Sequence, residues 1–297
     1  MSDRQLHPAD FPVSAAEQKD ILADLIWDID DEFHRSSRPR LVYVTGQPAA
    51  GKSRTVDYLS AQLDSPAVVL DSDDLRKNHP MMNEIMARDP QRMDVLSNGP
   101  VGFWMSELIA HTRNSRYNLI VENTLTNPRQ VMETAKTFQA AGYAVGVTAL
   151  AVPEDVSRLG IVTRYLAGVN SEDFPRWTTE TSHSSAYSGM VSGLEQMTGG
   201  VDRIEVYDRN AGPLYEGTDG ASAATILTAH RDKAMTQSQR DEWTDDYLGS
   251  VERLTQPGMV TPHTGTVLTK IVLAAERIVP AEQLPAAHYR LQELLTP

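Results

Sequence analysis

One segment of the chain carries residue types and spacing that bind phosphate. It reads Gly46-Gln47-Pro48-Ala49-Ala50-Gly51-Lys52-Ser53 and fits G-x-x-x-x-G-K-[ST], the P-loop. In a P-loop the backbone N–H groups point at phosphate oxygens, and the next helix presents its positive N-terminus to the same oxygens. Lys52 would reach the β- and γ-phosphates, and the Ser53 hydroxyl would bind magnesium. The segment therefore predicts a site for ATP or GTP with Mg²⁺.

The residues around this segment place it between a strand and a helix. The apolar run Leu41-Val42-Tyr43-Val44 precedes it, and Val56, Leu59 and Leu63 follow at helical spacing. A chance match in a surface loop would lack these flanks. The context therefore favours a true P-loop and, with it, a parallel α/β sheet.

Acidic side chains follow two further predicted strands at the point where each strand ends. The run 67–70 leads into Asp71-Ser72-Asp73-Asp74, and the run 119–121 leads into Glu122-Asn123-Thr124. Ligands of an open parallel sheet bind beyond the carboxyl ends of its strands, so these acids should lie beside the phosphates. One acid would position magnesium and another would accept the proton of an attacking hydroxyl. The alternative, strongest for Asp71 and Asp74, is that they cap the helices that follow.

Phosphoryl transfer also needs cations, because negative charge spreads over the equatorial oxygens in the transition state. Lys52 is one such cation. Arg164 and Arg176, on and just after the helix that follows the fourth predicted strand, are the other candidates. Arg158 and Arg203 are interpreted as solvated or ion-paired side chains. We expect the triphosphate at the end of the first strand, with the carboxylate of Asp73 reaching its outermost phosphorus from the neighbouring strand.

The remaining pattern predicts a P-loop kinase-like α/β fold with a helical extension. Short, mostly apolar strands separated by helical patterns indicate a parallel sheet flanked by helices. The segment Gly217-Thr218-Asp219-Gly220 predicts a linker, and only helical segments follow it. We therefore expect a kinase domain over 1–216, including an N-terminal helix, and a helical extension over 217–297. The extension would pack on the kinase core or, alternatively, act as a built-in restraint or a docking surface. The strands are expected at 41–44, 67–70, 119–121, 145–152 and 204–207.

Composition limits the partners. The formal net charge of −13 argues against nucleic acid and anionic membranes as ligands. The chain has no cysteine, which excludes disulfides and thiolate zinc sites, and its eight histidines show no metal-ligand spacing. No signal-peptide pattern and no apolar run of membrane-spanning length is visible. We expect a cytoplasmic protein.

Taken in order, these motifs resemble those of the zeta toxins, the toxin component of epsilon–zeta toxin–antitoxin systems. The order and most spacings match over about 14–215. The segments that carry the resemblance are Gly46 to Ser53, Asp71 to Pro80, Asn118 to Thr124, Ala151 to Glu154, Arg164-Tyr165, Arg176, His183 and Val206 to Arg209.

The resemblance implies a kinase that transfers the γ-phosphate of ATP to the 3′-hydroxyl of the sugar of UDP-N-acetylglucosamine. It implies that Asp73 is the catalytic base, that Lys52 is the phosphate-binding lysine, and that Arg164 and Arg176 face the phosphates. It also implies a partner, a small helical antitoxin of the epsilon type that blocks the nucleotide pocket.

On the acceptor side, the resemblance implies that Glu122 and Thr124 lie near substrate and magnesium. It implies that His79, with Pro80, borders the sugar-nucleotide pocket, and that Asp73 contacts the acceptor. Two positions depart from the family pattern. Ala49 stands where glycine is common, which is tolerated if the residue needs no positive φ. Asn123 also replaces a common glycine and would reshape the sugar pocket.

Three other functions remain open from the residues. The first is a phosphotransferase of the same type with another small acceptor, an antibiotic or a nucleotide. The second is a nucleotide-gated switch that hydrolyses triphosphate slowly without an acceptor. The third is an interaction module with a degenerate P-loop, which the intact Lys52 and Ser53 disfavour.

Overall fold

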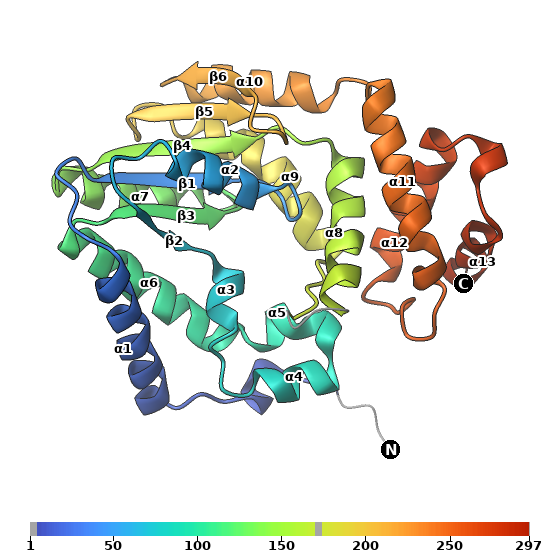
Figure 1. Cartoon of the computed structure of the whole chain (residues 1–297), viewed down its shortest axis with the longest axis horizontal. Helices are drawn as coiled ribbons and strands as arrows, with labels where there is room; N and C mark the ends of the chain where they lie inside the picture. Colours follow the sequence, from blue (N-terminus) through green and yellow to red (C-terminus); the bar gives the residue numbers. More distant parts are fainter. Residues whose placement is uncertain (1–4, 170–173, 297) are drawn as a thin grey trace.

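The structure is a computed structural model that describes residues 5–169 and 174–296. Its centre is a six-stranded sheet in the order β2-β3-β1-β4-β5-β6 (Figure 1). Strands β1 to β5 pair in parallel, which confirms the predicted parallel α/β architecture. The strands are β1 (Arg40–Thr45), β2 (Ala67–Leu70), β3 (Asn118–Asn123), β4 (Ala144–Leu150), β5 (Arg203–Tyr207) and β6 (Pro213–Gly217).

The edge strand β6 lies where the sequence predicts no strand. It runs antiparallel to β5 after a tight turn in which the Asp208 carboxylate accepts the N–H groups of Asn210 and Gly212, each at 2.8 Å. The side chains of β6 are only partly buried or exposed. An edge strand of this kind needs no apolar run, and the sequence therefore gives a weak strand signal.

Helices cover both faces of the sheet. On one face, α2 (Lys52–Ser60) packs with Val56 and Leu59 on Val42 and Val44 of β1. The alternate residues of β1, Leu41 and Tyr43, point to the other face, as the two-residue period of a strand requires. That face is covered by α1 (Ala15–Glu32), α6 (Asn98–Ser115), α7 (Pro128–Ala140), α9 (Glu180–Glu195) and α10 (Gly220–Arg231).

The segment predicted as a linker is instead the end of β6 and the start of α10. The carboxylate of Asp219 caps α10 by accepting the N–H groups of Ala221 and Ser222. A Cβ on Gly220 would lie 1.9 Å from the carbonyl oxygen of Leu194, so α10 is pressed closely against α9. Helix α10 thus shares the core of the sheet domain.

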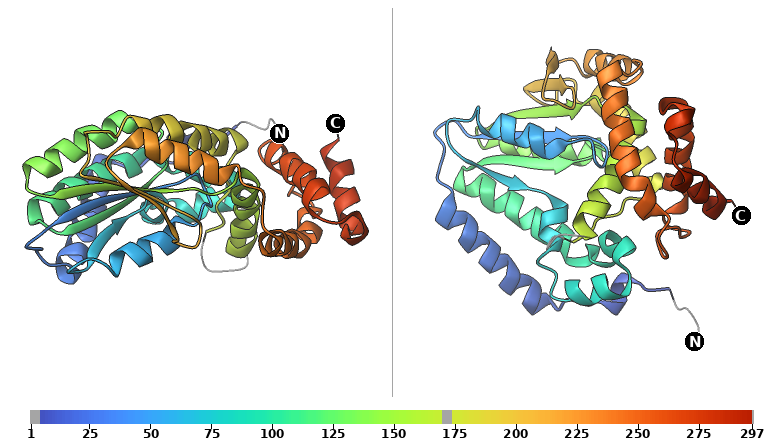
Figure 2. Two further views of the ribbon diagram at one scale, coloured as in Figure 1. Left: turned by 90° about the horizontal axis from the view of Figure 1, so that it is seen from above. Right: turned by 45° about the vertical axis from the view of Figure 1, so that its right-hand side comes forward.

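A second core forms around α8 (Glu154–Val169), with Trp243 and Tyr247 among its largest side chains. Figure 1 shows α8 between the sheet and three helices, α11 (Gln237–Leu254), α12 (Gly265–Ile278) and α13 (Ala286–Leu295). Both views of Figure 2 show these three helices, orange to red, gathered at one end of the molecule. Helix α8 is therefore the element through which they reach the P-loop.

Three short helices, α3 (Ser72–Arg76), α4 (Met82–Arg88) and α5 (Met93–Leu96), connect β2 to α6. Of these, α3 begins directly after β2 and carries Asp73 in its first turn. Over the described ranges 5–169 and 174–296, no helix combines the length and apolarity that crossing a bilayer requires.

Candidate active site

The P-loop joins β1 to α2 with two residues in the left-handed region. Gly51 has a φ of 89° and Ala49 a φ of 59°. Alanine at position 49 is expected to be tolerated only if the residue needs no positive φ, and the structure shows that it has one. A residue with a Cβ costs about 1 kcal/mol in this region, so the loop stores a small strain at Ala49.

The side chain of Gln47 anchors the P-loop from inside the protein. Its Nε2 donates to the carbonyl of Val152 at 2.9 Å and to Oγ of Ser157 at 3.1 Å. Its Oε1 accepts a hydrogen bond from Nη2 of Arg231 at 2.9 Å. The position of the loop thus depends on α8 and α10, since each supplies one of these side chains.

Helix α8 also touches the loop at Gly160. A Cβ at this position would lie 3.0 Å from Cβ of Ala49 and 3.1 Å from its carbonyl oxygen. These separations are too short for a comfortable contact, so the glycine lets the helix approach the P-loop backbone.

Gly160→Ala should lower the free energy of unfolding by roughly 1–3 kcal/mol, because the added methyl overpacks this contact. Gly249→Ala is the matched control: Gly249 is exposed within α11, and no neighbouring atom lies within 4 Å of the place that its new methyl would take. It should raise the free energy of unfolding by roughly 0.5–1 kcal/mol through helix propensity. Urea denaturation measures both. If the two variants were stabilised alike, the close approach at Gly160 would be wrong.

The acids that follow β2 have different positions. Asp71 caps α3, since its Oδ1 accepts the N–H of Asp73 at 3.1 Å. Asp74 pairs with Lys77 at 3.0 Å and is largely exposed. The capping alternative therefore describes Asp71, whereas Asp74 does not cap a helix.

Asp73 is held by arginines. Its Oδ1 lies 2.6 Å from Nη1 of Arg76, and its Oδ2 lies 2.8 Å from Nη1 of Arg176 and 4.0 Å from Nη1 of Arg164. The prediction that the strand before Asp73 lies next to β1 is wrong, because β3 lies between β1 and β2. Asp73 reaches the site from the first turn of α3.

These arginines decide the protonation of Asp73. Burial alone would raise the pKa of its carboxyl, but the charges of Arg176, Arg76 and Arg164 outweigh burial and hold the pKa below its ordinary value. Arg164 also donates from Nη2 to Oγ1 of Thr178 at 3.2 Å, while its Nε has no hydrogen-bond partner among the described residues. The free site thus holds an anionic carboxylate and guanidinium groups that can turn to another anion.

Lys52 and Glu122 face each other on the P-loop side, with Nζ 3.9 Å from Oε2. Burial lowers the pKa of Lys52, and the charges of Glu122 and Asp71 oppose this. Burial raises the pKa of Glu122 to about 7; Lys52 opposes the shift, and the carboxylates of Asp71, Asp74 and Asp73 add to it. Glu122 can therefore change charge near neutral pH.

Glu122→Gln should remove part of the pH dependence of stability. The folded protein holds the Glu122 proton more tightly than the unfolded chain, so this group stabilises the fold at low pH and loses that contribution between about pH 4.5 and 7. Relative to wild type, the variant should gain roughly 2 kcal/mol in free energy of unfolding from pH 5 to pH 8. Urea denaturation at both pH values measures this, and parallel curves would contradict the raised pKa.

Most predicted site residues line two adjoining cavities of about 240 and 520 Å³. Thr124 and Pro48 line the smaller cavity, and Ala49, Gly51 and Ser53 line the larger. The residues common to both are Lys52, Asp71, Asp73, Glu122, Arg164 and Arg176. The structure thus brings together the P-loop lysine, the carboxylates and both candidate arginines.

His79 is not among the residues that line these cavities. It is buried, and its Nδ1 accepts the N–H of Met81 at 3.2 Å. Its pKa is lowered by burial, with a backbone contact at Phe11 opposing the shift. In this structure the side chain fixes the turn after α3.

Two site residues have no role that the sequence alone predicts. Arg76 binds Asp73 from one turn further along α3, and the spacing i, i+3 on a helix is the signal that could have found it. Arg209, from the turn between β5 and β6, lines the larger cavity beside Gly51 and Lys52. No local pattern gives its position, because it depends on the pairing of β4 with β5.

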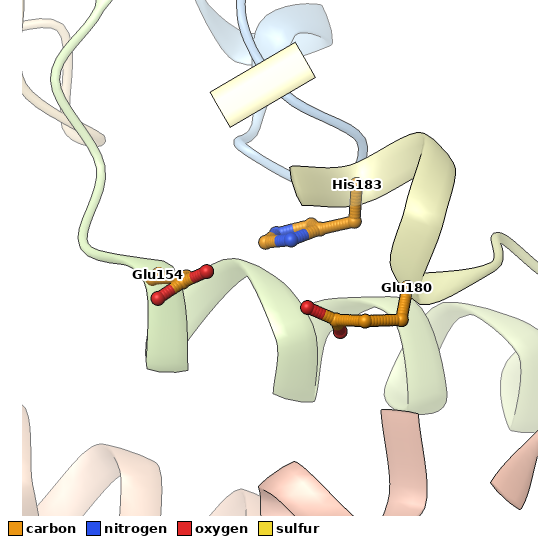
Figure 3. Close-up of side chains that lie close together, drawn as sticks. All are labelled: Glu154, Glu180 and His183. Carbon is orange, nitrogen blue, oxygen red and sulfur yellow. The ribbon is translucent and has the colours of Figure 1, made fainter. Parts of the chain in front are cut away.

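A third group of titratable side chains lies outside these cavities and is linked to the P-loop through Ser157 and Gln47. Glu154, Glu180 and His183 bring their ligand atoms within 4.8 Å of one another (Figure 3). Arg158 already binds both glutamates, with 2.8 Å to Oε1 of Glu180, and Lys270 lies 2.9 Å from the same oxygen. The group is thus an ion-pair network between α8, α9 and α12, and Arg158 is ion-paired as expected.

His183 completes this network as a neutral ring. Its Nε2 lies 2.8 Å from Oγ of Ser157. Burial and the charge of Arg158 lower its pKa to about 4. It therefore serves to position Ser157, which in turn receives a hydrogen bond from Gln47 of the P-loop.

The parallel sheet, the loop at the end of β1 and the lysine at the start of α2 define a P-loop kinase-like fold. Comparison with known proteins gives the family. The sequence model of the zeta toxins matches residues 24–219, most of the chain, and the protein belongs to the zeta toxin family. The resemblance of the motifs is thereby confirmed.

Individual relatives agree. The chain is 27% identical over 199 residues to a toxin zeta of Enterococcus hirae, covering 65% of this chain and 69% of the relative. It is 25% identical over 198 residues to toxin PezT of Streptococcus pneumoniae, covering 65% and 78%. A solved structure of the PezAT chromosomal toxin–antitoxin system of S. pneumoniae matches with a TM-score of 0.70 at 20% identity, over 83% of this chain and 99% of that chain. This match supports the fold.

Proposed function

We propose that this protein is an ATP-dependent kinase that phosphorylates the 3′-hydroxyl of the sugar of UDP-N-acetylglucosamine, as the toxin of a toxin–antitoxin system. The observation that carries the proposal is the placement of Asp73 among three arginines in a cavity that it shares with Lys52. Phosphoryl transfer to a hydroxyl requires a lysine that binds the phosphates, further cations that stabilise the transition state, and a carboxylate that accepts the proton. Family membership supports the acceptor and the toxin role.

The arginines would exchange partners when nucleotide binds. In the free protein they neutralise Asp73, which keeps its pKa low and makes it a weak base. Phosphate oxygens entering the cavity would draw Arg164 and Arg176 away from the carboxylate. The pKa of Asp73 would then rise, and the carboxylate could accept the proton of the attacking hydroxyl while the arginines stabilise the transferring phosphoryl group.

The donor set fits magnesium. The hydroxyl of Ser53 and the carboxylates of Asp71, Asp73 and Glu122 belong to residues that line the larger cavity, and Mg²⁺ prefers oxygen ligands. Ser53 would hold the ion, with one of the carboxylates acting directly or through water. When bound, the ion would neutralise charge on the β- and γ-phosphates.

The nucleoside would occupy a neighbouring cavity of about 290 Å³. It shares Gly51 and Arg209 with the phosphate cavity, so a triphosphate on the P-loop would extend into it. Its outer wall comes from α11, including Glu242, Trp243 and Asp246. The C-terminal helices would thus complete the nucleotide site. A small helical antitoxin of the epsilon type would inhibit the toxin by blocking this nucleotide site.

Transfer of label tests the function. Incubation with γ-labelled ATP, Mg²⁺ and UDP-N-acetylglucosamine should label the sugar nucleotide, and a 3′-deoxy analogue should remain unlabelled. If ATP were consumed only with another acceptor, the substrate assignment would be wrong. Slow hydrolysis unaffected by any acceptor would support a nucleotide-gated switch instead.

Two observations favour testing a second acceptor in parallel. His79 does not line the cavity, and Asn123 replaces the glycine common in the family, so the acceptor side differs from the expected pattern. An antibiotic or a nucleotide would be the alternative acceptor. A panel of such hydroxyl compounds, scored by acceptor-dependent ATP turnover, separates these possibilities.

A further inference from the structure

A fourth cavity, of about 470 Å³, lies where the sheet domain meets the C-terminal helices. The start of α8, Tyr187 of α9, the segment after α10 and parts of α11 and α12 form its walls. Six cationic side chains and two carboxylates, those of Glu154 and Asp155, line it. The net charge of its lining is therefore +4, in a chain whose formal net charge is −13. Its six cationic side chains are Arg158, Arg231, Lys233, Arg240, Lys270 and Arg277.

Three of these cations already have carboxylate partners. Arg277 lies 2.9 Å from Asp155, and Arg158 and Lys270 bind the glutamates of the network described above. Within the described part of the chain, the other three form no salt bridge. These three are Arg231, Lys233 and Arg240.

Arg231 is the most informative of them, since only 5% of its surface is exposed. Its Nη1 donates to the carbonyl of Tyr187 at 2.8 Å, and its guanidinium lies 4.1 Å from the centre of the Tyr187 ring. Its Nε has no hydrogen-bond partner among the described residues. Burial lowers its pKa to about 10, as expected for a guanidinium that has lost water without gaining an anion.

A buried cation without a counter-ion is costly, and a bound anion would remove that cost. Lys233 is exposed, and Arg240 is half-buried with its guanidinium directed to the carbonyl of Met235 and to Gln237. The three cations therefore offer a buried contact and two more accessible ones. Both Nη atoms of Arg231 donate to protein acceptors, so its Nε is the donor left for a ligand. Phosphate oxygens suit such cationic donors, because charge-assisted hydrogen bonds to them are strong.

We propose that this cavity binds a small molecule carrying one or more phosphate groups, at a site separate from the P-loop. Its volume lies within the range of small-molecule sites. The carboxylates Glu154 and Asp155 are already paired with arginines and do not oppose such a ligand strongly. The site would also adjoin the P-loop through Arg231, whose Nη2 holds Gln47.

Calorimetric titration with inorganic pyrophosphate tests the site. The P-loop also binds phosphate, so the titration uses full-length Lys52→Ala protein, in which binding at the P-loop is weakened. We expect one saturable site in this variant. Adding Lys233→Glu and Arg240→Glu should weaken that binding at least about tenfold, because two charge-assisted contacts are reversed.

Lys136→Glu in the same background is the matched control, since Lys136 is an exposed lysine of α7 that does not line the cavity. It should leave the affinity unchanged. Lys233→Glu alone replaces an exposed side chain that forms no salt bridge in the described structure, so it should fold normally. It controls for misfolding of the double variant, and it should itself weaken binding several-fold. No saturable binding to Lys52→Ala protein, or equal affinity in all variants, would overturn the proposal. Binding of acidic peptides but not of pyrophosphate would also overturn it.

Discussion

Asp73→Asn should reduce the turnover of ATP with acceptor by about two to four orders of magnitude. The carboxylate lies between Arg76 and Arg176, and it is the anion that those groups hold in the free site. Asparagine keeps the shape, and its Oδ1 can still accept a hydrogen bond from one arginine, but it cannot take a proton from the attacking hydroxyl. Steady-state kinetics with saturating ATP and acceptor measure the loss.

Nucleotide affinity distinguishes this role from a structural one. Removing a negative charge beside the phosphates should leave ATP binding unchanged or tighter, while kcat falls. Asp57→Asn, on the exposed face of α2, is the matched control and should keep turnover within about threefold of wild type. Wild-type turnover by Asp73→Asn would refute its assignment as the base.

Arg176→Ala should cost more, about three to five orders of magnitude in kcat. Arg176 lies 2.8 Å from Asp73 and 3.7 Å from Asp71, and its side chain is partly exposed to the cavity. It can therefore turn to the transferring phosphoryl group at little structural cost. Single-turnover measurements with labelled ATP isolate the chemical step.

The conservative variant sharpens this prediction. Arg176→Lys keeps the charge but loses the paired donors of the guanidinium, and it should recover only part of the activity. Arg129→Ala, an exposed arginine of α7 paired with Glu133, should have no effect. A normal kcat with a raised KM in Arg176→Ala would contradict this role, because it would show that the arginine binds the ground state and the transition state equally.

The local parts of this protein could be predicted from its sequence. The five parallel strands are short apolar runs, and the P-loop has a fixed residue spacing. The meeting of the acids after β2 and β3 with the P-loop is predictable, because parallel strands end at one edge of the sheet. These features depend on residues that are close in the chain.

The features that could not be predicted depend on contacts between distant segments. Insertion of β3 between β1 and β2 follows from the crossover connections, not from any one strand. Ala49 has a positive φ in a loop that contacts Gly160 of α8 and is anchored by Gln47, and both contacts join segments distant in the chain. Spacing on α3 indicates the pair of Asp73 with Arg76, but it does not reveal that Arg164 and Arg176 reach the same carboxylate from distant segments.

The most direct test of the account is a crystal structure with a non-hydrolysable ATP analogue, Mg²⁺ and UDP-N-acetylglucosamine. We expect the phosphates on the P-loop with Lys52, the base in the cavity beside Arg209 and α11, and Arg176 turned from Asp73 to the γ-phosphate. The acceptor hydroxyl should lie within hydrogen-bond distance of Asp73, about 3 Å. The account would be contradicted if the triphosphate bound elsewhere. It would also be contradicted if the acceptor hydroxyl lay far from Asp73 while the arginines still held that carboxylate.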